Sequence, residues 1–189
     1  MDAAAIIDAL SRTVPAAGLE PVQAGDGMPT IYVAAAQLVD TCRALRDVSE
    51  LRFVFLADLL PVDYLPREPR FEIVYLLASL GMAGFGDEPK RLRIKVRVPG
   101  SNPLLPSVSS VWPAANWPER EAYDLFGIHF SDHPDLRRIL MPDDWEGFPL
   151  RKDYPVQIKQ PVKTYEPLQV SQEQFVANIE ATRDRARNE

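Results

Sequence analysis

The sequence K-R-L-R-I-K-V-R-V, from Lys90 to Val98, alternates basic and aliphatic residues without a break. Successive side chains of a β-strand point to opposite faces, so this segment predicts a strand with one apolar face and one basic face. The apolar face belongs to a core. The basic face could receive an acidic partner, or it could be a solvated face that discourages edge pairing, which we favour.

Apolar runs before this strand extend the predicted sheet. Phe53 to Leu60 and Phe71 to Leu80 are rich in Phe, Ile, Val, Leu and Tyr and are bounded by prolines and Gly81. These features are typical of sheet strands. Thr30 to Val33 predicts a further, short strand.

Two amphipathic helices are predicted before the long strands. Apolar residues recur at spacings of three and four from Ala3 to Val14 and from Ala34 to Val48. Cys42 lies on the apolar face of the second helix, and we interpret it as a core residue rather than a reactive thiol. These elements predict an α+β fold, a small mixed or antiparallel sheet with helices on one face.

Prolines change the character of the chain after Val98. Ten of the eighteen lie between Pro103 and Pro167, and proline removes a backbone donor and fixes φ. We expect an α+β domain over residues 1–99, a short-helix and loop region packed on it over residues 100–158, and an extended C-terminal strap with a short helix over residues 159–189. Such a strap suits a chain that lies against another protein, with a mobile tail as the alternative for its last part.

Composition excludes several kinds of function. The 189 residues carry a formal net charge of −6, which argues against nucleic-acid binding because phosphates require a basic surface. Cys42 is the only cysteine, so we expect no cysteine-ligated metal cluster in this chain. We see no signal peptide and no apolar run long enough to cross a membrane, and we expect any membrane contact to be peripheral or through another subunit.

The densest group of charged and aromatic side chains runs from Asn116 to Leu140, N-W-P-E-R-E-A-Y-D-L-F-G-I-H-F-S-D-H-P-D-L-R-R-I-L. Asn116 followed three residues later by Glu119 predicts a capping box at the start of a helix. Gly127 is placed to end that helix in the left-handed conformation. We therefore expect a helix of about ten residues, from Trp117 to Phe126.

Side-chain roles on this helix follow from its period. Arg120 is expected to pair with Asp124 one turn later. Tyr123 can pack its ring and place its hydroxyl on a partner. Three residues are expected to pack in the core: Trp117, Leu125 and Phe126.

A metal or acid–base site is one alternative for this segment, because His129 and His133 are four residues apart with acids nearby. Ligands at that spacing converge only on a helix, whereas Gly127 and Pro134 place the pair in a turn. The chain contains no HExxH motif, nucleophile elbow, phosphate loop or dinucleotide fingerprint. We therefore favour a docking surface over a small metal-dependent hydrolase.

A second motif, D-D-W-E-G-F-P-L-R-K-D-Y-P from Asp143 to Pro155, repeats the order of acids, an aromatic and glycine turn, and bases. Arginines hold carboxylates bidentately and aromatics supply rigid contact area, as at the anchor points of an interface. Arg137 and Arg138 could equally form internal salt bridges.

The run E-R-E-A-Y-D-L-F-G-I-H-F-S-D-H-P-D-L-R-R-I-L, from Glu119 to Leu140, resembles the signature of the NADH-quinone oxidoreductase subunits C, the 30 kDa subunit family of respiratory complex I. The motif from Asp143 to Pro155 also resembles that family. The resemblance covers about residues 30 to 170 of the chain. Pro118 departs from the pattern, since histidine is expected there.

The resemblance implies a non-catalytic member of the hydrophilic arm that holds no cofactor or metal. It implies contact with subunits D, B and I, of which the first is hydrogenase-like and the others are iron–sulfur proteins, peripherally on the cytoplasmic side of the bacterial inner membrane. The whole complex passes electrons from NADH through FMN and iron–sulfur clusters to quinone and couples this to proton translocation. The equivalent subunit of a ferredoxin- or deazaflavin-linked dehydrogenase, or of an energy-converting hydrogenase, is the alternative.

Together the two motifs define the candidate docking residues, some of which are expected to pair internally and some with a partner. They are Glu119, Arg120, Glu121, Tyr123, Asp124, Phe126, Gly127, His133, Pro134, Arg137, Arg138, Trp145, Arg151, Lys152 and Tyr154.

Overall fold

The computed structural model describes residues 2–81, 88–155 and 171–187, with side chains of the last stretch described as far as residue 180. Residues 1–155 form one compact unit, and residues 156–189 form a second. The described part of the second unit is a single helix, α4 (Gln172–Arg187). Residues 159–170, predicted as an extended strap, lie outside the described residues.

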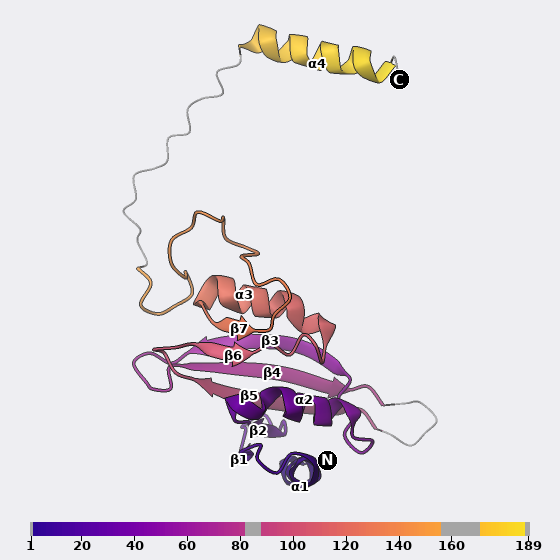
Figure 1. The fold of residues 1–189 in the computed structure, drawn as a ribbon, viewed down its shortest axis with the longest axis vertical. Helices are drawn as coiled ribbons and strands as arrows, with labels where there is room; N and C mark the ends of the chain where they lie inside the picture. Colours follow the sequence, from indigo (N-terminus) through magenta and orange to yellow (C-terminus); the bar gives the residue numbers. More distant parts are fainter. Residues whose placement is uncertain (1, 82–87, 156–170, 188–189) are drawn as a thin grey trace. The chain divides into compact units, whose positions relative to one another are not determined.

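The first unit is built on a five-stranded sheet in the order β1-β2-β5-β4-β3 (Figure 1). β2 runs parallel to β5 and the other neighbours are antiparallel, so the sheet is mixed. In chain order the elements of this part are α1 (Ala3–Thr13), β1 (Glu20–Val22), β2 (Thr30–Tyr32), the 3-10 turn η1 (Ala35–Gln37), α2 (Leu38–Asp47), β3 (Phe55–Asp63), β4 (Phe71–Ser79) and β5 (Lys90–Val98).

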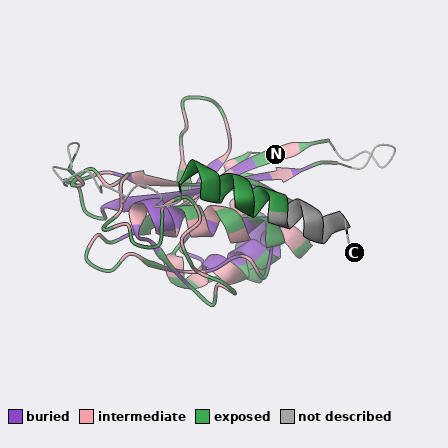
Figure 2. Cartoon of the chain, turned by 90° about the horizontal axis from the view of Figure 1, so that it is seen from above, coloured by how far each residue is buried: buried purple, intermediate pink, exposed green. Residues whose placement is uncertain are grey.

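The inner face of the sheet forms the centre of the core. Pairing of β4 with β5 places Ile73 opposite Val96 and Tyr75 opposite Ile94, and all four side chains are fully buried. α1 and α2 cover this face, and the buried residues gather where helices and strands meet (Figure 2). The predicted α+β class, with helices on one face of a mixed sheet, is confirmed. The helices contribute the core residues Ile6, Leu10, Leu38, Cys42 and Leu45.

Local chemistry explains the bounds and burial of the first two helices. The carboxylate of Asp2 accepts a hydrogen bond from the backbone N–H of Ala5 and caps α1. The helix stops before Pro15, as predicted. Cys42 is fully buried on α2, and burial raises the pKa of its thiol. This agrees with the prediction of an inert core residue.

The second half of this unit packs beside β3 and is largely irregular. Its elements are β6 (Leu104–Pro106), the 3-10 turn η2 (Pro113–Ala115), α3 (Asn116–Phe126) and β7 (His129–Ser131). β6 and β7 form a two-stranded parallel sheet, in which the N–H of His129 donates to the carbonyl of Pro103 at 2.8 Å. The prediction that His129 lies in a turn is therefore wrong. Within the described ranges, no helix is long and apolar enough to cross a membrane.

Candidate functional site

α3 ends as its sequence predicts but begins differently. Gly127 follows the helix with φ +69°, the left-handed conformation expected at this position. Asn116 is already helical, with φ −51° and ψ −53°, and the preceding Ala115 makes no side-chain capping bond. The predicted capping box is wrong because the Glu119 carboxylate turns into the core rather than back to the helix start.

Glu119 joins α3 to the loop that follows β6. One carboxylate oxygen accepts from the Ser107 hydroxyl at 2.6 Å, and the other accepts from the backbone N–H of Val108 at 2.8 Å. The side chain is fully buried, and this burial raises its pKa to about 7, against the opposing effect of its two hydrogen bonds. Glu119 therefore ties that loop to the core and has no surface for a partner to reach.

His133 fixes the turn after β7 against the start of α3. Its Nδ1 accepts from the backbone N–H of Asp135 at 3.0 Å, which leaves the proton on Nε2. Nε2 lies 3.0 Å from the carbonyl oxygen of Asn116 and 3.9 Å from the Glu119 carboxylate. His129 instead packs edge-on against Tyr123, at 5.1 Å between ring centroids. In the described part of the chain, no three His, Cys, Asp or Glu side chains are placed to hold a metal ion.

Asp124 organises the loop that runs along α3. One oxygen accepts from the Arg138 guanidinium at 2.7 Å. The other accepts from three successive backbone N–H groups, those of Ile139, Leu140 and Met141, at 2.7 to 3.0 Å. Burial alone would raise the pKa of Asp124, but these donors outweigh burial and hold it below its usual value.

The predicted pair between Arg120 and Asp124 is wrong, because each side chain binds the following loop instead. Arg120 donates to the carbonyls of Arg137 at 3.1 Å and Arg138 at 3.0 Å. The Arg138 guanidinium also reaches the carbonyls of Trp145 and Gly147. The charged side chains of the two motifs thus bind one another's backbone and fix the loop.

Arg151 and Phe148 close the second motif over the end of α3. Arg151 donates to the carbonyls of Phe126 and Gly127 at 2.5 and 3.3 Å, and its guanidinium lies 4.6 Å from the Phe148 ring centroid. A Cβ on Gly127 would overlap that ring and would lie 2.6 Å from the Arg151 guanidinium. Glycine is required here by backbone conformation and by close approach together.

An ion-pair cluster that the sequence did not reveal anchors the second motif to the sheet. Arg70, before β4, binds Asp63 at the end of β3 through two hydrogen bonds of 3.0 and 2.7 Å, and binds Asp153 through two more. The backbone N–H of Lys152 also donates to Asp63. No spacing signal identifies this cluster, because its members are brought together only by folding.

We call α3 and the loop of residues 133–155 laid along it the α3 platform. Its interior is fixed by Glu119, Asp124 and Arg138, and its surface carries exposed apolar side chains. Trp117 is 71% exposed, which shows that its predicted packing role is wrong, while Leu125 is buried and Phe126 partly buried. Leu140 and Leu150 are also exposed, at 60% and 53%. The remaining candidate residues at the surface include Glu121, Pro134, Arg137 and Lys152, with Trp145 and Tyr154 half-buried.

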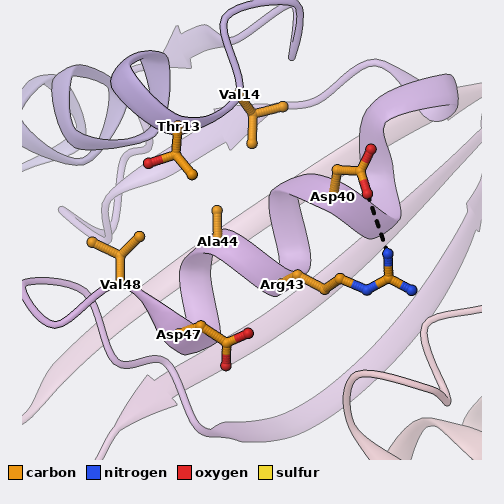
Figure 3. A pocket seen from close by; sticks show the side chains of 7 residues that line it. All are labelled: Thr13, Val14, Asp40, Arg43, Ala44, Asp47 and Val48. Atoms are coloured by element: carbon orange, nitrogen blue, oxygen red, sulfur yellow. Dashed lines mark hydrogen bonds and ion pairs between the residues drawn. The ribbon is translucent and has the colours of Figure 1, made fainter.

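A groove lies away from the platform, between the end of α1 and α2 (Figure 3). It encloses about 390 Å³ and is lined by Thr13, Val14, Asp40, Arg43, Ala44, Asp47 and Val48. Asp40 pairs with Arg43 at 3.4 Å, and Asp47 pairs with Arg46 at 2.7 Å. The ionic side chains of this groove are thus engaged on their own helix.

The fold and the platform define a class of protein: an α+β domain whose charged motif builds a fixed surface. Residues 31–160 match the family model described as "Respiratory-chain NADH dehydrogenase, 30 Kd subunit". The chain therefore belongs to that family, the 30 kDa subunits of NADH-quinone oxidoreductase.

Relatives and solved structures agree with this assignment. Two of the relatives are the NADH-quinone oxidoreductase subunits C of Roseiflexus sp. (strain RS-1) and Geobacter sulfurreducens. The first is 47% identical over 156 residues, covering 82% of this chain and 86% of the relative. The second is 48% identical over 143 residues, covering 75% and 83%. The trypsin-resistant fragment of Nqo5 matches with a TM-score of 0.56 and 34% identity, over 69% of this chain and 99% of the fragment.

A chain of the archaeal membrane-bound sulfane sulfur reductase has a similar fold. Its TM-score is 0.65 at 24% identity, over 81% of this chain and 85% of that chain. At this identity the likeness concerns the fold alone. The two relatives with curated names are subunits of NADH-quinone oxidoreductase, an oxidoreductase complex of the respiratory chain.

Proposed function

We propose that this chain is a docking and assembly subunit of NADH:quinone oxidoreductase that carries no redox centre of its own. FMN, the iron–sulfur clusters and quinone would be bound by partner subunits. The chain would bind the hydrogenase-like subunit of the complex, near the iron–sulfur subunits B and I. It would lie peripherally on the cytoplasmic side of the membrane, in the enzyme that couples electron transfer from NADH to proton translocation.

The observation that supports this proposal most strongly is the construction of the α3 platform. Its buried charges bind their own chain, so the loop is held in one conformation before a partner arrives. Preorganisation of this kind reduces the entropy cost of binding. Trp117, Leu140 and Leu150 remain exposed on it, and exposed aromatic and aliphatic side chains on a rigid surface are suited to act as interface anchors.

Trp117 gives the sharpest test of docking. Trp117→Ala removes a side chain that is 71% exposed, so the isolated chain should keep its stability while the amount of assembled complex falls. The assembled complex is measured on native gels and by co-purification with a tagged chain. Trp117→Phe is the matched control and should retain assembly, because it keeps an aromatic ring.

Identification of the companions completes the test. The hydrogenase-like subunit and flavin-bearing subunits in the purified complex would support the proposal and identify the electron donor. Normal assembly of the Trp117→Ala and Leu140→Ser variants would contradict a docking role for the platform. So would normal assembly with a selective loss of quinone reduction.

A further inference from the structure

The outer face of the sheet, opposite α1 and α2, is unusually apolar on β4. Antiparallel strands with one solvated face alternate apolar and polar residues, whereas strands covered on both faces read as continuous apolar runs. β4 reads F-E-I-V-Y-L-L-A-S. Its inner face carries Ile73 and Tyr75, and its outer face carries Val74, Leu76 and Ala78. The sequence of β4 is therefore that of a strand covered on both sides.

An apolar pocket lies at one end of this outer face. It encloses about 390 Å³ and is lined by the ends of β3, β4 and β5 together with Met28. Phe55 and Ala57 of β3 contribute to it and are both exposed, Phe55 to 47%. Leu80, just after β4, also lines the pocket and is 65% exposed. Large exposed apolar side chains around a hollow mark an interaction surface rather than a solvated one.

The cations of β5 show what charge the occupant carries. Arg93 pairs with Asp26, Lys95 with Glu72 and Arg97 with Glu20. These internal pairs account for most of the basic face that the sequence predicts. The remaining base of this face, Arg91, lines the pocket.

Arg91 has no carboxylate partner among the residues that the structure describes, and the neighbouring Lys90 donates only to the carbonyl of Glu50. The lining of the pocket includes these two cations and no acid. In a chain whose net charge is −6, this is a local excess of positive charge beside an apolar hollow. An occupant with apolar side chains and a carboxylate complements both features.

We infer that the outer-face pocket binds an amphipathic, acidic segment of another protein of the complex, with apolar side chains against Phe55 and Leu76 and a carboxylate on Arg91. A protein segment fits better than a lipid chain, because the apolar surface continues from the pocket along the strands to Leu60, which is 43% exposed. This surface is separate from the α3 platform and requires only that the chain works in a multi-subunit complex.

Thiol labelling tests whether this face is covered in the complex. Cys42 is the only native cysteine and is buried, so Ala57→Cys introduces an accessible thiol. Its reaction with a maleimide should be at least about tenfold slower in the assembled complex than in the isolated chain, a difference of about 1.4 kcal/mol in accessibility. Equal rates in the two states would overturn the proposal.

Charge variants and cross-linking identify the occupant. Arg91→Glu should abolish protection of Ala57→Cys, whereas Arg91→Lys and the paired-site control Arg97→Glu should retain it. A photo-cross-linking residue placed at Phe55 should capture, in the complex, a peptide of another subunit that contains Asp or Glu. Cross-links confined to this chain would overturn the proposal, and so would protection of the isolated chain by anionic phospholipid vesicles alone.

Discussion

Arg70 and Asp153 lie 83 residues apart in the sequence and meet through two hydrogen bonds of 2.8 and 2.7 Å. The same guanidinium holds Asp63, at the end of β3, through two further hydrogen bonds. Asp63 and Asp153 thus share one cation, and the second signature motif is attached to the sheet at this point. The pKa of Asp63 is held at about 2, because its hydrogen bonds with Arg70, Lys152 and Leu65 outweigh the effect of burial.

Removal of the Arg70 guanidinium should destabilise the domain strongly. For Arg70→Met we expect the free energy of unfolding to fall by about 3 kcal/mol, because a buried carboxylate is left without its cation. The side chains of Arg70 and Asp63 are only 10% and 3% exposed. Urea unfolding at neutral pH measures the change.

Arg97→Met is the matched control for this variant. It breaks a pair with Glu20 in which the two side chains are 46% and 60% exposed, and such surface pairs contribute less than about 1 kcal/mol. If both variants lost the same stability, the buried cluster would be no more important than a surface ion pair.

Asp124 should control the order of the α3 platform. Asp124→Asn replaces an acceptor-only carboxylate by an amide with one acceptor oxygen, so several of the donors from Arg138 and residues 139–141 lose their partner. We expect a loss of about 2 kcal/mol in stability and faster proteolysis within residues 133–155. Asp135→Asn is the control, since Asp135 and Arg137 are 49% and 72% exposed. Unchanged proteolysis in Asp124→Asn would argue against this role.

The sequence predicts the elements of the fold better than the directions of its charges. Alternation in β5, apolar runs in β3 and β4 and the glycine after α3 are local signals, and each is confirmed in the structure. The capping box and the Arg120–Asp124 pair are also local rules, but they failed. Both acids of these rules are drawn into the core, where donors from Ser107, Val108 and residues 139–141 replace the helical partners.

Trp117 shows the same limit from the other side. Large aromatic residues are usually packed inside, and the sequence therefore predicts a core role for Trp117. The first turn of α3 leaves it exposed because the core beside this helix is completed by smaller residues, among them Ala115 and Ala122. Whether a side chain faces the core depends on what occupies the space, which no single-helix pattern contains.

Gly127 should tolerate no side chain. Gly127→Ala forces a Cβ into the left-handed conformation and into overlap with the Phe148 ring, so we expect a loss of about 2 kcal/mol. For a chain of this size, that corresponds to a fall in Tm of about 6 °C. Gly25→Ala is the control: a Cβ there meets nothing within 4 Å and the backbone is outside the left-handed region. Equal Tm values for the two variants would contradict the requirement for glycine.

Glu119 should make the stability of the domain depend on pH near neutrality. Its pKa is raised from 4.5 to about 7 in the folded protein, chiefly by burial. Between these values the folded state retains a proton that the unfolded state has released, so stability is full below about pH 4.5 and falls as pH rises to about 7. At about 1.4 kcal/mol per pKa unit, the loss is about 3 kcal/mol.

Glu119→Gln should remove this dependence, because the amide imitates the protonated carboxyl and does not titrate. Urea unfolding between pH 5 and pH 8 compares the two proteins, and Glu121→Gln, an exposed position on the same helix, should keep the parental slope. Asp63, with a pKa of about 2, affects stability only at lower pH and does not interfere. His133 is present in every variant, so a slope that persists in Glu119→Gln would assign the proton to another group.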